Sequence, residues 1–321
     1  MYAIQVDSLG SQSRYRYTTV DLPTAGPDEV LIKLEAIGVN PMEQTIRLGY
    51  FPTSLAVPFT PGSEGAGTVV EPRNGFKAGD RVFVLGGGQG IFRPGTYAEY
   101  VAANKDAVVP IPPDMSFEEA AAFGVATLTA WLVLHRTASV QRGETVLILG
   151  GSGAVGTMAL QLAKRAGAYV IVTVGKQAKV EAAKELGADV VLLTDGQFAS
   201  NLDGLGYDID VIVDLIGDEY LGHALHLAKH NARIVMVGYS AGPRVSFNVI
   251  DVLKNELSVK GFNLFTANPI DIGAAMNDIM TAYAKGEIKV VVDRVFSLAA
   301  AEEATMYRLS RDVFGRVVLN P

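Results

Sequence analysis

The segment of the chain best suited to chemistry is a glycine-rich turn near its middle. Glycines stand at 150, 153 and 156, directly after the apolar run 146–149 and directly before a helical pattern of apolar residues. A strand, a glycine turn and a helix in this order can bind a dinucleotide, because backbone N–H groups can approach the pyrophosphate. A P-loop would need a lysine before Thr157, where this chain has glycine. The cofactor contacts expected in the turn are those of Gly150, Ser152, Gly153, Ala154, Val155 and Gly156.

The next expected strand, residues 169–174, bears on the choice between the two nicotinamide cofactors. NAD-selective sites carry Asp or Glu at the end of this strand, bonded to the ribose 2′-hydroxyl. This chain has Lys176 and Lys179 there and no acidic residue between 169 and 179. Lysines attract the 2′-phosphate that a carboxylate would repel. The alternative is that both lysines belong to a solvated helix start, and we predict NADP(H).

Three of the four histidines, His223, His226 and His230, lie at i, i+3 and i+7, the spacing of one helical face. They could bind a transition metal, although we favour the polar outer face of a helix expected over 220–229. The fourth, His135, lies at an expected helix end, where we predict a structural role. The chain has no cysteine, which excludes disulfides and thiolate metal sites.

Composition narrows the function classes further. The 321 residues suggest about two domains, and the net charge of −7 without a basic block gives nucleic-acid binding no electrostatic support. Residues 1–7 lack the pattern of a signal peptide, and we expect no apolar run that approaches the ~20 residues of a membrane span. The expectation is a cytoplasmic protein with a small-molecule substrate and no membrane or nucleic-acid partner.

The elements that position these residues fall into two groups. Residues 1–118 are predicted to be β-rich, with strands at 30–36 and 81–84 separated by Gly and Pro, as in a compact barrel. From about residue 145, strands and helices alternate, which indicates a doubly wound parallel sheet. We therefore predict an α/β protein in which 1–118 and 263–321 form one domain and 119–262 form a dinucleotide-binding domain between them.

Several blocks of sequence resemble one known family. They are 38–41, 61–67, 79–82, the glycine turn and 315–319. The chain is similar to medium-chain dehydrogenase/reductases of the zinc-free NADPH:quinone oxidoreductase (zeta-crystallin-like) family, from about residue 30 to 321. The resemblance implies a GroES-like β-barrel catalytic domain plus a Rossmann domain. It also implies hydride transfer from NADPH to a quinone or related α,β-unsaturated carbonyl, and a homodimer joined at the strand expected over 257–262.

The same resemblance bears on a metal. Zinc alcohol dehydrogenases of the superfamily have a Cys where Asn40 stands and a His where Ser63 stands, and no Cys occurs near residue 126. No metal is therefore expected.

The resemblance also extends the cofactor site. Lys179, four residues after Gly175, matches a family lysine that binds NADPH, and Lys176 is an additional candidate. Arg311 matches a family arginine that reaches the 2′-phosphate, and Thr194 aligns with a family tyrosine. The remaining expected contacts, around the adenosine or the nicotinamide, are those of Gly238, Tyr239 and Phe265.

Hydride transfer needs little chemistry from the protein, but the product oxyanion must be stabilised or protonated. Asn40 is the first candidate, the alternative being a turn residue before a proline. Thr129 matches a family threonine near the cofactor, the alternative being a buried helical hydroxyl. Family members often have Tyr where this chain has Phe51, so the hydroxyl is missing or displaced to Tyr50.

Two acidic residues, Glu43 and Glu64, either orient this site or pair with Arg47. Two other functions stay open. One is a 2-enoyl reductase of the same superfamily. The other is a non-catalytic, NADPH-binding, crystallin-like protein.

Overall fold

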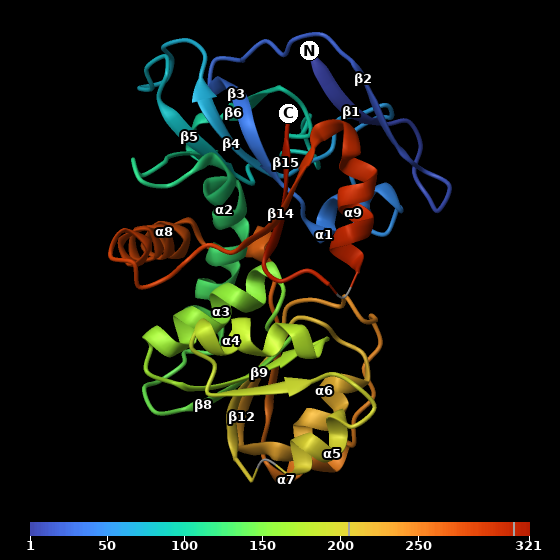
Figure 1. Cartoon of the computed structure of the whole chain (residues 1–321), viewed down its shortest axis with the longest axis vertical. Helices are drawn as coiled ribbons and strands as arrows, with labels where there is room; N and C mark the ends of the chain where they lie inside the picture. The colour runs from blue at the N-terminus through green and yellow to red at the C-terminus, as the bar shows by residue number, and fades with distance from the viewer. Residues whose placement is uncertain (205, 311) are drawn as a thin grey trace. The chain divides into compact units, whose positions relative to one another are not determined.

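The computed structural model describes residues 1–204, 206–310 and 312–321, and the chain divides into two compact units (Figure 1). Unit 1 comprises residues 1–125 and 290–321, and unit 2 comprises 126–289. The sequence predicted boundaries at 118/119 and 262/263, whereas the units divide at 125/126 and 289/290. Residues 263–289 belong to unit 2 because their helix is tied to that unit: Arg165 holds the Asp278 carboxylate with two hydrogen bonds of 2.7 Å.

Unit 2 is built on a six-stranded sheet, counted over its described residues, and every strand pairing in it is parallel. The strand order β10-β9-β8-β11-β12-β13 is that of the doubly wound dinucleotide-binding fold. The central strands are buried on both faces, and their apolar runs reflect this. The strands are β8 Thr145–Leu149, β9 Tyr169–Val174, β10 Val190–Leu193, β11 Ile209–Asp214, β12 Ala228–Met236 and β13 Ser258–Gly261.

Helices flank this sheet, and α3 packs against β8 and β9 (Figure 1). Helix α3 is amphipathic and buries Leu160 and Leu162 completely. The helices of unit 2 are α3 Ala154–Arg165, α4 Val180–Glu185, α5 Phe198–Asp203, α6 Glu219–Ala224, α7 Val249–Lys254 and α8 Pro269–Ala284, and the 3₁₀ turns are η3 Gln177–Lys179, η4 Leu225–Leu227 and η5 Leu264–Thr266.

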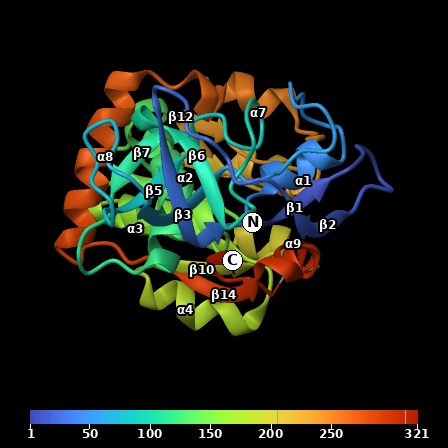
Figure 2. The ribbon, with the colours of Figure 1, turned by 90° about the horizontal axis from the view of Figure 1, so that it is seen from above.

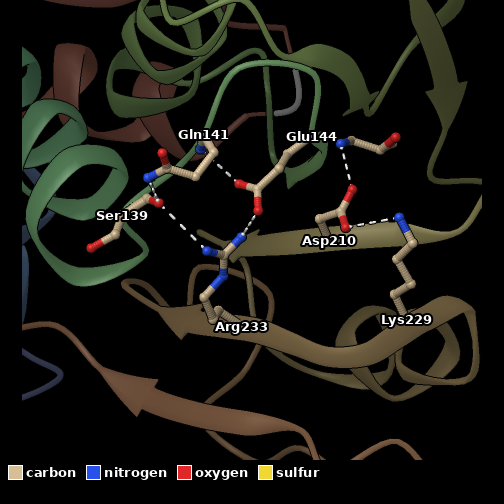
Figure 3. Close-up of polar contacts among 7 residues, drawn as sticks. Ser139, Gln141, Glu144, Asp210, Lys229 and Arg233 are labelled. Carbon is tan, nitrogen blue, oxygen red and sulfur yellow. Dashed lines mark hydrogen bonds and ion pairs between the residues drawn. The ribbon is translucent and has the colours of Figure 1, made fainter.

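A polar network holds the amino ends of three strands of this sheet together (Figure 3). Glu144, just before β8, accepts a hydrogen bond of 2.5 Å from Arg233 Nη2 of β12. Asp210 of β11 accepts hydrogen bonds from the first backbone N–H of β8 at 2.9 Å and from Lys229 Nζ at 3.0 Å. The network therefore joins β8, β11 and β12 at the edge opposite to the glycine turn.

The histidines do not share one helical face. The helix expected over 220–229 ends at Ala224, and strand β12 already begins at Ala228. His223 lies in α6, His226 in η4 and His230 in β12. Because the chain from Ala228 onward pairs with β11 as a strand, the helical interpretation of the histidine spacing was wrong.

Unit 1 contains, among its described residues, a seven-stranded sheet in the order β14-β15-β3-β4-β5-β7, with β6 also paired to β3. Figure 2 shows β3 and β6 side by side. All these pairings are antiparallel except that of β14 with β15. Its core contains Ile32, Leu34, Tyr97 and Val317. The elements are β1 Tyr2–Val6, β2 Tyr15–Thr19, β3 Glu29–Gly38, α1 Pro41–Arg47, β4 Glu64–Val69, β5 Arg81–Leu85, β6 Tyr100–Asn104, β7 Val108–Pro110, β14 Val292–Ser297, α9 Ala301–Leu309 and β15 Arg316–Asn320, with the 3₁₀ turns η1 Lys105–Ala107 and η6 Leu298–Ala300.

Helix α2 (Phe117–Trp131) continues into a π-helical segment (η2, Leu132–Thr137), and the unit boundary falls within α2. The 21 residues 117–137 are long and apolar enough to cross a membrane by length and composition alone. The expectation that no run approaches this length was therefore wrong. Because 72% of the apolar window is buried inside the protein, the helix has the character of a core helix.

Candidate functional site

The turn expected to bind the pyrophosphate connects β8 to α3, and its three motif glycines meet different constraints. Gly150 has a φ of +92°, a conformation that favours glycine. A Cβ on Gly156 would lie 2.2 Å from the Gly150 carbonyl oxygen, so α3 packs directly on the turn. A Cβ on Gly153 would meet only that oxygen, at 3.8 Å, which is ordinary contact. Packing inside the protein therefore explains glycine at 150 and 156, whereas close approach of a ligand would explain it at 153.

Helix α3 starts directly after this turn. Gly153 is its N-cap, Ala154 and Val155 are its first residues, and no side chain caps this end within the described structure. The N-terminus of a helix of this length offers N–H groups and the positive end of the helix dipole to an anion. The residues present therefore fit a bound pyrophosphate.

Thr173 of β9 holds the turn in place, a role that the sequence analysis missed. Its hydroxyl accepts a hydrogen bond from Gly150 N at 2.9 Å, and its carbonyl oxygen accepts one from Gly151 N at 2.8 Å. Thr173 is fully buried. The available signal was Thr173 itself, the one threonine in the apolar strand that precedes Gly175.

Lys179 lies beside the turn. Its side chain is buried, and Nζ lies 3.4 Å from Ser152 Oγ. Lys176 is exposed, and Thr194 is bonded through its backbone N–H to Val174 O at 3.0 Å, next to Gly175. The structure therefore brings the cationic group of Lys179, 29 positions after Gly150 by residue number, to the glycine turn of the same unit.

The remaining cofactor candidates of unit 2 lie after the carboxyl ends of β12 and β13. A Cβ on Gly238 would lie 2.5 Å from Leu215 O, so close approach of two strand ends requires this glycine. Tyr239 and Phe265 are both half exposed. Arg311, expected at the 2′-phosphate, lies outside the residues that the structure describes.

Asp214, at the end of β11, shapes the neighbouring loop and was also missed. Its carboxylate accepts hydrogen bonds from Ile216 N at 3.0 Å and Gly217 N at 2.9 Å. Burial raises the pKa of Asp214, and these two N–H groups oppose the increase. Since Ile216 lies against Gly150, Asp214 helps to define the space at the glycine turn.

In unit 1, Asn40 precedes α1 and anchors a buried polar cluster. Its Nδ2 group donates to Ser63 Oγ at 3.0 Å and to Glu64 Oε1 at 2.8 Å. These two bonds use both amide hydrogens, because a carboxylate such as that of Glu64 can only accept. The side chain therefore offers its carbonyl oxygen to a ligand, an acceptor where the sequence suggested a donor.

Glu64 and Glu43 hold the two sides of this cluster. Glu64 forms a buried ion pair with Arg316 and accepts a hydrogen bond from Val125 N at 2.9 Å. Glu43 Oε1 accepts hydrogen bonds from Ser63 Oγ at 2.8 Å and Ser63 N at 3.1 Å. Burial raises the pKa of Glu43 despite these bonds, and burial lowers the pKa of Arg316 to about 10, which leaves it charged at neutral pH.

The other catalytic candidates have different surroundings. Tyr50 is 78% exposed, whereas Phe51 is partly buried and packs against a small cluster that includes Ile46 and Phe59. Thr129 is buried in α2. Phe51 thus contributes to the packing of unit 1, and the one hydroxyl of the Tyr50–Phe51 pair is on the exposed residue.

The residues present do not fit a zinc ion. Asn40 and Ser63, at two positions where zinc alcohol dehydrogenases have ligands, are bonded to each other. Among the described residues there is no group of three or more His, Cys, Asp or Glu side chains that could hold a metal ion. An amide and a hydroxyl are also poor substitutes for thiolate and imidazole at zinc.

Comparisons with known proteins agree with this architecture. Residues 26–113 match the alcohol dehydrogenase GroES-like domain, and residues 154–293 match the family described as zinc-binding dehydrogenase. A quinone oxidoreductase of Sus scrofa is 32% identical, over 99% of this chain and 97% of that protein.

Two solved structures are similar to the chain over its whole length and their own. One is the quinone oxidoreductase of Thermus thermophilus, also studied in complex with NADPH, with 30% identity and a TM-score of 0.86. The other is described as an NAD-dependent alcohol dehydrogenase, with 30% identity and a TM-score of 0.90.

Proposed function

The chain belongs to the quinone oxidoreductase family of the medium-chain dehydrogenase/reductase superfamily, and from this we propose that it transfers a hydride from NADPH to a quinone or a related α,β-unsaturated carbonyl without a metal ion. The single observation that carries the proposal is that Lys179 Nζ lies beside Ser152 of the glycine turn. The segment from the end of β9 to Lys179 contains no acidic residue. This arrangement favours a cofactor with a 2′-phosphate.

The residues of unit 2 have distinct roles in this proposal. Backbone N–H groups of Ala154 and Val155 at the start of α3 bind the pyrophosphate, which Gly153 lets approach. Lys179 binds the 2′-phosphate, with Lys176 as a weaker, solvent-screened contact. NADPH, when bound, supplies the hydride. Tyr239 and Phe265 present exposed rings after their strands, where they exclude water from a bound nucleotide.

Unit 1 contributes the polar cluster around Asn40. The carbonyl oxygen of Asn40 orients a donor group of the substrate, and the ion pair of Glu64 with Arg316 fixes the amide. The amide of Asn40 and the hydroxyl of Ser63, at two positions where zinc alcohol dehydrogenases have ligands, support chemistry without zinc.

Steady-state kinetics test the proposal. NADPH and NADH oxidation are measured with a panel of quinones, enals and enoyl thioesters. We expect turnover with quinones and a kcat/KM for NADPH at least about 10-fold above that for NADH. Preference for enoyl thioesters would favour a 2-enoyl reductase, and tight NADPH binding without turnover would favour the non-catalytic alternative. Comparable efficiency with both cofactors would contradict the assigned role of Lys179.

A homodimer and a cytoplasmic location belong to the same proposal. Strand β13 pairs only with β12 among the described residues, and all four of its residues are exposed. An uncovered strand edge is a site for pairing with a second copy.

A further inference from the structure

We propose that Ser63 and Glu43 supply the proton that accompanies the hydride: the Ser63 hydroxyl protonates the carbonyl oxygen of the acceptor, and Glu43 returns a proton to Ser63. The inference rests on the proposed function, because it concerns the same reaction. It assigns a proton donor to a site whose amide, Asn40, has no hydrogen left to give.

Exposure identifies the group that can reach a substrate. Asn40, Glu43 and Glu64 are 7%, 3% and 1% exposed, whereas Ser63 is only partly buried. Ser63 is therefore the residue of this cluster that is not fully buried, and its hydroxyl contacts the buried carboxyl group of Glu43.

The hydrogen-bonding capacity of Ser63 explains its direction. A serine hydroxyl has one hydrogen and accepts two hydrogen bonds. Asn40 Nδ2 donates to Oγ at 3.0 Å, and a protonated Glu43 would donate to it across the 2.8 Å contact with Oε1. Both acceptor positions are then filled, so the hydroxyl hydrogen is free to point away from the cluster. When Glu43 is ionised, the hydroxyl must instead donate to Glu43, and the outward donor is lost.

The surroundings of Glu43 favour the protonated form. Within the described residues its Oε2 is buried without a hydrogen-bond partner, which penalises a full negative charge. Burial raises its pKa more than the hydrogen bonds from its own backbone and Ser63, and the charges of Arg316 and Arg308, lower it. Four charged or titratable groups interact with it, from β2, the β5–β6 connection, α9 and β15: Tyr15, Tyr97, Arg308 and Arg316. Beyond these, Arg47 of α1 pairs with Glu302 of α9, and Glu64 of β4 pairs with Arg316.

The step balances in atoms and charge. The acceptor gains one hydride, which carries both electrons, and one proton on its oxygen. The O–H bond of Ser63 breaks as the O–H bond of the product forms, and the hydrogen on Glu43 Oε1 moves to Ser63 Oγ. Glu43 ends as a carboxylate and, because it is buried, regains a proton from solvent through Ser63 before the next turnover.

The test compares four variants with the wild type in H₂O and D₂O, with NADPH and a benzoquinone, across pH. In the wild type we expect kcat to fall as pH rises through the raised pKa of Glu43, together with a solvent isotope effect. Ser63→Ala should lose about 10²–10⁴-fold in kcat, the usual contribution of general acid catalysis, and the isotope effect. Ser63→Thr should restore both, and Glu43→Gln should flatten the pH profile.

Thr45→Ala is the matched control, because it removes a hydroxyl from the same helix as Glu43. That hydroxyl donates to the carbonyl oxygen of Pro41 at 3.0 Å, within the helix itself. Its activity should equal that of the wild type. NADPH affinity, measured by fluorescence, should stay unchanged in all variants. An infrared band of a protonated carboxylic acid, present near neutral pH and absent in Glu43→Gln, is a readout independent of turnover.

The outcomes separate this inference from the proposed function. One outcome is that the wild type reduces quinones and Ser63→Ala keeps the wild-type kcat, isotope effect and pH profile. This would overturn Ser63 as the proton donor and leave the proposed function in place. Absence of the infrared band would remove Glu43 from the relay. No oxidation of NADPH by any acceptor would overturn the function, and the proton relay with it.

Discussion

Gly153 and Gly156 differ in what a methyl group at each would contact. At the scale of single residues, we therefore expect Gly153 to matter for cofactor binding and Gly156 to matter for folding. A Cβ at 153 meets ordinary contact at 3.8 Å, and a Cβ at 156 collides with Gly150 O at 2.2 Å. We predict that Gly153→Ala changes the free energy of unfolding by less than about 1 kcal/mol and weakens NADPH binding about 10-fold.

Gly156→Ala, in contrast, should lower the free energy of unfolding by about 3 kcal/mol, because α3 must move off the turn. Urea unfolding and fluorescence titration with NADPH measure the two effects on both variants. Equal destabilisation of the two variants would show that residue 153 is also constrained by packing.

Lys179 gives the second prediction at this scale. Lys179→Gln should lower kcat/KM for NADPH by about 10–100-fold, since a hydrogen bond to a charged group contributes about 1.5–3 kcal/mol, and should change that for NADH little. Lys176→Gln should have a smaller effect, because its exposed charge is screened by solvent. Kinetics of both variants with both cofactors decide, and an equal loss for NADH would contradict a 2′-phosphate contact.

The buried acid Glu43 gives a prediction for stability against pH. Its pKa is raised in the folded state, so the native protein binds this proton more tightly than the unfolded chain does. The stabilisation is present in full below the unfolded pKa and is lost as pH rises through the folded pKa. Glu43→Gln should remove this part of the pH dependence, about 1.4 kcal/mol for each pH unit between the two pKa values.

Urea unfolding of wild type and Glu43→Gln at several pH values makes the comparison. Parallel stability curves for the two proteins would mean that Glu43 titrates alike in the folded and unfolded states.

At the scale of elements, the network at the amino ends of β8, β11 and β12 contains contacts of unequal strength (Figure 3). Glu144 accepts from Gln141 N at 2.7 Å and from Arg233, and both partners of its ion pair are largely buried. We predict that Glu144→Ala lowers the free energy of unfolding by about 1–3 kcal/mol, because the largely buried Arg233 guanidinium keeps only its contact with Ser139 O and the N–H of Gln141 loses its acceptor.

Lys229→Ala is the comparison within the same network. Its side chain is 48% exposed, so loss of its pair with Asp210 should cost less than about 0.5 kcal/mol. Equal losses for the two variants in urea unfolding would mean that burial does not set the strength of these contacts.

Much of the architecture could be predicted, because several patterns in the chain are compatible with only one kind of secondary structure. Alternating apolar strands and amphipathic helices after residue 145 predicted the parallel sheet, and the glycine spacing predicted the turn between β8 and α3. The sequence predicted a helix up to residue 229, whereas α6 ends at Ala224 and β12 begins at Ala228. Residues 228–231 have no apolar pattern that marks a strand, and they belong to one only through the pairing of β12 with β11.

Site residues followed the same division. A cofactor role for Lys179 is predicted from the missing acid after β9, which is visible in sequence, and the structure shows its Nζ 3.4 Å from Ser152 Oγ. The sequence could not predict that both amide hydrogens of Asn40 are used inside the protein. Their acceptors, Ser63 and Glu64, are more than 20 residues away in the chain and contact Asn40 only in the folded unit. Thr173 and Asp214 act through backbone N–H groups, and such contacts leave little trace in residue type.

At the scale of the whole molecule, the exposed strand β13 predicts how copies of the chain associate. Val259→Asp places a charge on this edge, where Val259 is 39% exposed, and should convert the proposed dimer to a monomer in light scattering. Ile270→Asp, at a 79% exposed position at the start of α8, should leave the mass unchanged. If the Val259→Asp variant remains a dimer, the dimer interface does not lie at the edge of β13.

The pairing of β15 with β3, which sets Leu319 opposite Ile37, has a consequence for synthesis on the ribosome. Every strand of the unit 2 sheet lies within one continuous stretch, so that sheet can form while the chain is still being extended. The sheet of unit 1 must wait for residues 316–320, and β3 keeps an unpaired edge at this pairing until they emerge. The amino-terminal part of the polypeptide is therefore made first but completes its sheet last, and its exposed strand edge can pair wrongly during that interval.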